Sequence, residues 1–292
     1  MQARRWLAQL LVAAATLLAR PPAGEAQWVE EPGKGWGSLT IYHQDTRHYF
    51  GIMGNKRPFV LDGHAVATSG FLTADIGLFP GVDVWIQPSF HRLWFRDAAG
   101  RQVSRGPGDA RFYLRISPLR ALGRAVPLAI RGGVKIPLGD FDVGSPLNPG
   151  AGQLIPLGDG QTDYEMLVEM GRSFYPKPLY LMGWLGYRWR AKNTSTGVDY
   201  GDERFFLAAA GGELGRVSYK LTLDAIYGEA PRTSGGPAPG AEREILRVNP
   251  TLALPLGPGL VEVGVRRPLS GKNLPAGTDF TVGYFTRWAL WN

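Results

Sequence analysis

The sequence predicts an all-β protein, a transmembrane antiparallel up-and-down β-barrel of about twelve strands. Three observations lead to this prediction: an export segment at the N-terminus, short segments of alternating hydrophobicity, and connections that alternate between short and long. Forty Gly and nine Trp in 292 residues, without long charged helical runs, are typical of a strand-rich chain with many turns.

The first 26 residues predict a secretory signal peptide. Arg4 and Arg5 precede the apolar run 6–19, and Gly24 and Ala26 stand where small residues precede a cleavage site. The apolar run is shorter than the ~20 residues that a helix needs to cross a bilayer. We expect cleavage after Ala26, which leaves residues 27–292 as one exported barrel domain.

The composition of the mature chain excludes several classes of protein. Removal of the leader takes away three Arg and one Glu, so the formal net charge falls from +7 to +5. The charges are dispersed along the chain, which argues against a nucleic-acid partner. The absence of Cys excludes a disulfide framework and a thiolate metal site. We expect no metal and no cofactor.

The mature chain divides into short segments in which polar and apolar residues alternate. In the segment 216–228, Tyr219 and Leu221 take one face, while Lys220 and Asp224 take the other. Twelve segments of this kind are predicted as strands: 36–44, 66–79, 82–95, 109–118, 126–137, 162–175, 178–190, 203–214, 216–228, 243–256, 259–268 and 278–291.

The lengths of the connections distinguish a membrane barrel from a soluble β-sandwich, which would show the same alternation. Outer-membrane barrels have short periplasmic turns and long outer loops, and an even strand number returns both ends of the barrel to the periplasm. The predicted tight turns are Pro80-Gly81, Pro176-Lys177, Gly215 and Gly257-Pro258, and the predicted long loops are 96–108, 138–161, 191–202, 229–242 and 269–277.

Aromatic residues near the strand ends agree with a membrane location. Membrane barrels carry aromatic girdles at both interfaces, although core aromatics of a soluble protein would give a similar pattern. The aromatic residues in question are Trp94, Tyr187, Trp189, Tyr227, Tyr284 and Trp288. The last predicted strand is also aromatic-rich and resembles the assembly signal of outer-membrane barrels, except that Asn292 follows its last aromatic residue.

Charged residues occupy the face that would line the lumen of the barrel. Two interpretations are open: a salt-bridged, largely filled interior, or a narrow aqueous path with a positive wall made by Arg115, Arg131, Lys135 and Arg188. The residues predicted along a substrate path are Arg111, Arg115, Arg131, Lys135, Arg188, Arg190, Arg266, Glu165 and Glu262.

Ser89, His91 and Asp83 share one strand face and are the candidate residues for an enzymatic site. Hydrolysis by a serine nucleophile needs a histidine within hydrogen-bond reach. Residues two apart on a strand are separated by ~6.6 Å along it, which predicts no direct bond between Ser89 and His91. We therefore expect a polar cluster here, and no catalytic residues.

Several segments resemble the outer-membrane transporter family named after the MetA pathway of phenol degradation. The similarity covers about residues 109–291 and rests on the order and spacing of short motifs. Those motifs are Gly132-Gly133-Val134-Lys135-Ile136-Pro137-Leu138-Gly139-Asp140, Gly158-Asp159-Gly160-Gln161-Thr162-Asp163, Leu185-Gly186-Tyr187-Arg188, Gly201-Asp202-Glu203 and Arg267-Pro268-Leu269-Ser270-Gly271. The resemblance implies passage of small, often hydrophobic compounds and no established catalytic residues.

Together, these observations predict a porin-like channel or transporter for small hydrophobic or anionic molecules in the outer membrane of a Gram-negative cell. The expected partners are outer-membrane lipid, the barrel-assembly machinery and a small-molecule solute. A non-conducting structural or adhesive barrel and a lipid-modifying barrel enzyme are the alternatives.

Overall fold

The computed structural model describes residues 29–121, 127–139, 156–174, 176–194, 197–233 and 236–290. The predicted signal peptide, with its cleavage after Ala26, lies outside these residues, as does the end of the chain at Trp291 and Asn292.

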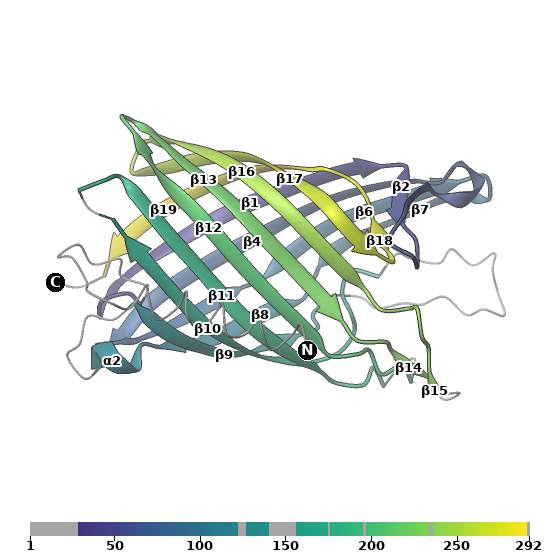
Figure 1. Cartoon of the computed structure of the whole chain (residues 1–292), viewed down its shortest axis with the longest axis horizontal. Coiled ribbons are helices and arrows are strands. Elements are labelled where there is room, and N and C mark those ends of the chain that lie inside the picture. Colours follow the sequence, from purple (N-terminus) through teal and green to yellow (C-terminus); the bar gives the residue numbers. More distant parts are fainter. Residues whose placement is uncertain are drawn as a thin grey trace, which may run out of the picture.

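One antiparallel sheet closes on itself to form a barrel (Figure 1). Each wall strand pairs with its neighbours, and β1 pairs with both β19 and β4, so the wall has no open seam. The predicted all-β barrel is therefore confirmed. Its strands are β1 (Lys34–Thr46), β4 (His64–Phe79), β5 (Val82–Gln87), β6 (Ser89–Asp97), β7 (Gly100–Pro107), β8 (Ala110–Ile116), β9 (Leu128–Ile136), β10 (Asp163–Ser173), β11 (Leu179–Arg190), β12 (Glu203–Leu214), β13 (Val217–Gly228), β16 (Glu244–Leu256), β17 (Gly259–Lys272) and β19 (Asp279–Ala289).

Two of the wall strands are interrupted, which reconciles these fourteen segments with the twelve predicted strands. Pro88 separates β5 from β6, because proline has no amide hydrogen to donate to the ladder. Gly108 and Asp109 separate β7 from β8. The amide of Gly108 still donates to the carbonyl of Ser89 at 3.0 Å, so the two broken strands run side by side through their breaks.

The prediction of a long loop over 96–108 is wrong. β6 and β7 continue beyond the end of β9 as a hairpin that turns at Ala98 and Ala99. The carboxylate of Asp97 accepts hydrogen bonds from the amides of Ala99 and Gly100 at 2.9 and 3.1 Å and stabilises this tight turn. The outward face of this segment carries arginines, which a strand can do where it extends outside the hydrocarbon.

The two ends of the barrel differ, as the connection lengths predict. We call the end with the long connections the outer end and the opposite one the inner end. The outer end carries a small sheet of β2 (His48–Phe50), β3 (Lys56–Pro58) and β18 (Leu274–Pro275). It also carries the ribbon β14 (Arg232–Thr233) and β15 (Gly236–Pro237) and the 3₁₀ turn η1 (Val60–Asp62). The inner end carries the tight turns and α2 (Pro118–Ala121), as Figure 1 shows. Lys34 pairs with Ala289, so the first and last wall strands have their terminal ends together at the inner end.

The polarity of the two faces of the sheet is the reverse of that in a soluble protein, with apolar side chains outside and charged side chains inside. On β10, Tyr164, Met166 and Val168 are 57, 46 and 46% exposed, whereas Asp163 and Glu165 on the other face are 0 and 4% exposed. Apolar side chains outside and charged side chains inside suit hydrocarbon around the barrel, where closure satisfies every backbone hydrogen bond. The soluble sandwich is therefore excluded. Separately, no helix in the described part of the chain has the length and apolarity needed to cross a bilayer.

Candidate functional site

The lumen is filled with ion pairs on one side and hollow on the other. The filled side lies under β5 and β8–β12, and the hollow side lies largely under β1, β13, β16, β17 and β19. The salt-bridged, filled interior is therefore found on one side of the barrel, and open space that could form a path is found on the other.

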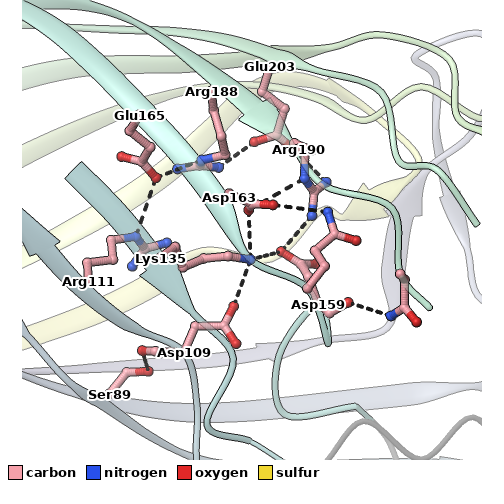
Figure 2. Close-up of polar contacts among 12 residues, drawn as sticks. Ser89, Asp109, Arg111, Lys135, Asp159, Asp163, Glu165, Arg188, Arg190 and Glu203 are labelled. Carbon is pink, nitrogen blue, oxygen red and sulfur yellow. Dashed lines mark hydrogen bonds and ion pairs between the residues drawn. The ribbon is translucent and has the colours of Figure 1, made fainter. Parts of the chain in front are cut away.

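The outer part of the filled side is built around Lys135, which comes from β9 and is 1% exposed. Its Nζ lies 2.9 Å from Asp109, 2.9 Å from Asp159 and 2.8 Å from Asp163. Arg190 completes the group with an ion pair of 2.7 Å to Asp159. Figure 2 shows these five side chains converging, and they come from three strands, β9, β10 and β11, and from two connections. We call Lys135, Asp109, Asp159, Asp163 and Arg190 the Lys135 cluster.

Asp159 lies outside the strands, and the cluster changes its acidity. Burial by itself would raise the pKa of its carboxyl, but the positive charges of Lys135, Arg190 and Arg243 outweigh burial. The pKa is held well below its usual range as a result. A group with a lowered folded-state pKa stabilises the fold above its unfolded pKa, and this contribution is lost as the pH falls toward the folded value.

Asp159→Asn should therefore lower the free energy of unfolding by an amount that depends on pH. The difference in free energy of unfolding should be largest above about pH 5 and should narrow as the pH falls toward 2, because the unfolded carboxyl takes up its proton below about pH 4. Urea unfolding in detergent micelles at pH 7, 5, 3 and 2 measures it. A difference that stays constant over this range would contradict the assignment.

A second group of ion pairs occupies the centre of the filled side. Arg188 donates from Nε to Glu165 at 2.7 Å and also pairs with Glu203. Glu165 accepts a further hydrogen bond from the hydroxyl of Tyr113 at 2.5 Å and lies 3.8 Å from Arg111. Every charge in this group has a partner of opposite sign, which makes its burial tolerable.

A third group fills the inner end. Arg115 contacts Asp83 and Asp75, at 3.0 and 2.7 Å, and Glu169 at 3.6 Å. Arg131 pairs with Glu169 at 2.7 Å, and its guanidinium lies 4.0 Å from the ring centre of Trp85. Such a stack contributes more when both groups are shielded from water.

Described residues line two cavities on the hollow side. The inner cavity has a volume of about 1070 Å³ and combines aromatic rings with hydroxyls and one ion pair. The outer cavity has a volume of about 270 Å³ and is lined largely by charged side chains. The residues that line the inner cavity include Trp36, Tyr42, Phe71, Trp85, Trp184, Phe285, Lys220, Glu262 and Arg266. Those that line the outer cavity include Asp159, Arg188, Glu203, Arg243, Arg247, Arg266 and Asp279.

Arg266 borders both cavities and marks the place where they meet. Its Nε donates to Asp279 at 2.5 Å, and its guanidinium lies 4.4 Å from the ring centre of Tyr42. Arg247 stands beside it in the outer cavity, with its Nε 2.9 Å from Asp224. The junction therefore has two held guanidinium groups and an aromatic ring. We call Arg266, Arg247, Tyr42, Asp279 and Asp224 the junction.

The structure places all nine residues of the predicted substrate path in ion pairs. Three of them, Arg188, Arg266 and Glu262, border a cavity. The other six lie on the filled side and line neither of these two cavities: Arg111, Arg115, Arg131, Lys135, Arg190 and Glu165. Among the four residues of the predicted positive wall, Arg115, Arg131 and Lys135 are at most 8% exposed, and each pairs with at least one carboxylate.

Sequence reasoning missed the aromatic lining of the lumen. Trp36 and Tyr42 come from β1, where the even-numbered residues face inward, and Asp279 lies opposite Gln44 in the β1–β19 register. The segment 36–44 was predicted as a strand, but no face was assigned to it. The apolar residues Leu39 and Ile41, which are exposed on the outside, alternate with the even-numbered residues, and this alternation could have assigned the even-numbered residues to the lumen face.

The expectation that Ser89 and His91 make no direct bond is wrong. Their side chains point to the same face and converge, so that Ser89 Oγ lies 3.1 Å from His91 Nε2. Gly108 makes room for this contact, because a Cβ there would lie 2.2 Å from the imidazole ring. Side-chain length closes the gap that the spacing of Cα atoms leaves open.

This contact lacks the arrangement of a hydrolase. The Ser89 hydroxyl donates to the backbone carbonyl of Asp109 at 2.8 Å, and His91 Nδ1 contacts Ser69 at 2.8 Å. Among the hydrogen bonds of the described residues, no carboxylate orients His91, and Asp83 is held by Arg115 instead. Both side chains also face the lumen and not the lipid.

Comparisons with known proteins support the fold. No family model and no curated protein matches the sequence. An outer membrane channel from Pseudomonas putida F1 superposes with a TM-score of 0.70 at 15% identity, over 92% of this chain and 100% of that one. The β domain of the Bordetella autotransporter Brka superposes with a TM-score of 0.52 at 11% identity, over 88% of this chain and 99% of that one. At these identities the likeness concerns architecture, and the chain has the fold of a Gram-negative outer-membrane barrel.

Proposed function

We propose that this protein is an outer-membrane channel for small molecules, whose path runs through the inner cavity, the junction and the outer cavity. The observation that carries this proposal is that Arg266 lines both cavities, so that one side of the lumen is hollow on both sides of a single charged junction. In this proposal the signal peptide is cleaved after Ala26, the inner end faces the periplasm, and lipid surrounds the barrel.

The chemistry of the path indicates which solutes would pass. The aromatic rings of Trp36, Trp85 and Phe285 offer an apolar surface to a solute in the inner cavity. Arg266 and Arg247, paired with Asp279 and Asp224, present guanidinium groups and carboxylates at the junction, and charged side chains that line a path set its preference for anionic, cationic or polar solutes. Of the nine predicted path residues, we propose that Arg188, Arg266 and Glu262 contact the solute, while the other six keep the filled side rigid.

Reversing the charge of Arg266 should change ion selectivity. A change of two charge units acts on a monovalent ion at about 8 Å in water with about 1 kcal/mol, against anions and in favour of cations, so Arg266→Glu should shift the anion-to-cation permeability ratio about 30-fold toward cations. The reversal potential under a salt gradient in planar bilayers measures this ratio.

The neighbouring residue provides a matched control. Arg267 follows on the same strand but is exposed on the outward face, so Arg267→Glu makes the same charge change away from the path. Selectivity should be unchanged in this variant. An equal shift in both variants, or none in Arg266→Glu, would reject the path. A folded protein with no conductance would point to a structural or adhesive barrel.

A further inference from the structure

The hairpin of β6 and β7 carries four arginines on its outward face, arranged as two cross-strand pairs. Arg92 lies opposite Arg105, and Arg96 lies opposite Arg101. All four side chains are exposed. The pair Trp94 and Val103 separates the two arginine pairs on the same face. We call Arg92, Arg105, Arg96 and Arg101 the arginine rungs.

None of the four has a carboxylate partner among the residues that the structure describes. Asp97 accepts hydrogen bonds from the amides of the hairpin turn, and Asp45 on β1, which is separated from β6 by β4, pairs with His64 at 2.6 Å. Like charges directly opposite on a sheet are destabilising. Arg101 lies 5.4 Å from the ring centre of Trp94, but no described carboxylate neutralises the four charges, in contrast with the paired charges of the lumen. Their positive charge is therefore available to a ligand outside the chain.

The depth of the rungs places them at the outer edge of the lipid-facing surface. Phe90 precedes Arg92 on the same face and is 56% exposed, as befits a side chain in hydrocarbon. Trp94, which packs against His64 with ring centres 4.7 Å apart, is the kind of residue that sits at headgroup level. Figure 1 shows the hairpin at the end that carries β2 and β18. The first rung therefore begins where the apolar belt ends.

We propose that the arginine rungs bind the phosphate groups of anionic glycolipid headgroups in the outer leaflet of the membrane. Guanidinium groups recognise phosphate with paired, charge-assisted hydrogen bonds. Two facing arginines can share one phosphate, which turns a repulsive pair into a binding site, while Phe90 and Trp94 pack against the acyl chains and their glycerol or sugar attachment. This inference rests on the proposed placement in the outer membrane but not on conduction.

The test compares lipids that differ only in phosphate. The mature barrel in detergent is titrated with bis-phosphorylated lipid A and with the same lipid after dephosphorylation, and bound lipid is counted by native mass spectrometry. At about 1 kcal/mol for each basic residue near an anionic surface, Arg92→Gln/Arg105→Gln should weaken binding of the phosphorylated lipid about 30-fold. Arg96→Gln/Arg101→Gln should act in the same direction.

The control removes the same charge elsewhere. Arg204 and Arg267 are exposed on outward strand faces near the outer end, and Arg204 already pairs with Glu229 at 3.1 Å, so Arg204→Gln/Arg267→Gln should leave binding unchanged. The folded state of each variant is checked by its heat-dependent shift on a denaturing gel.

Three results would overturn the inference. Equal binding of the dephosphorylated lipid would mean that acyl packing alone is responsible. Displacement by millimolar inorganic phosphate would indicate a soluble anion as the ligand. Unchanged binding in both double variants would mean that the arginines only protect the free edge of β7. Conductance is recorded on the same preparations, so that a barrel without conductance, which would contradict the channel proposal, is distinguished from a barrel without lipid binding.

Discussion

Lys135→Met is expected to lower the free energy of unfolding by about 3–5 kcal/mol. The substitution keeps most of the side-chain volume but removes the charge that holds Asp109, Asp159 and Asp163 together. Arg190 is the remaining basic member of the Lys135 cluster, and its ion pairs to Asp159 and Asp163 are 2.7 and 3.6 Å. Buried carboxylates without compensation are costly, which is why breaking such a group exceeds the cost of an ordinary core substitution.

A second lumen lysine provides the comparison. Lys220 pairs with Glu262 at 3.1 Å, but the two side chains are 31 and 37% exposed to the inner cavity. Water screens such a pair, so Lys220→Met should cost about 0–1 kcal/mol. Urea unfolding of both variants in the same detergent, followed by tryptophan fluorescence, measures the difference. Equal losses would show that burial of the Lys135 cluster does not govern its contribution.

Gly133→Val is expected to lower the free energy of unfolding by about 2–4 kcal/mol. Gly133 lies on β9 directly opposite Tyr113, whose ring lies across it in the lumen. A Cβ at this position would lie 2.2 Å from Cδ1 of Tyr113 and 2.4 Å from the carbonyl oxygen of Phe112. Valine would therefore push Tyr113 away and break its hydrogen bond to Glu165. The cost is overpacking together with one lost hydrogen bond to a charged group.

Gly132 is the matched control because it is the adjacent residue in the chain and faces lipid. A Cβ there would meet nothing within 4 Å. Glycine weakens a strand interior, so Gly132→Val should leave stability unchanged or raise it slightly. Chemical unfolding of both variants separates them. If Gly132→Val lowered the free energy of unfolding by a comparable amount, the cause would be the lost backbone flexibility of the Gly132-Gly133 pair. The space that Tyr113 requires would then not be the cause.

Local pattern was sufficient for the strands of this barrel. A strand that separates lipid from a charged lumen must alternate, and a one-residue error would put charge into hydrocarbon. For this reason the segment 203–214 was predicted with the bounds that β12 has, and the inward direction of Arg188, Glu262 and Arg266 could be read from their neighbours. The hairpin of β6 and β7 escaped this reasoning, since it extends beyond the lipid and carries arginines on its outward face.

The sequence by itself predicted the β-barrel, the number of its strands and the lumen face of the charges on its transmembrane strands, because these properties depend on period and on neighbours in the chain. Only the tertiary structure decided which charges are buried. Lys135 and Arg266 look alike in the sequence, yet Lys135 lies against three carboxylates and Arg266 lies between two cavities. The physical reason is that burial of a lumen charge depends on side chains reaching across the barrel from distant strands and connections, and no local pattern specifies where they meet.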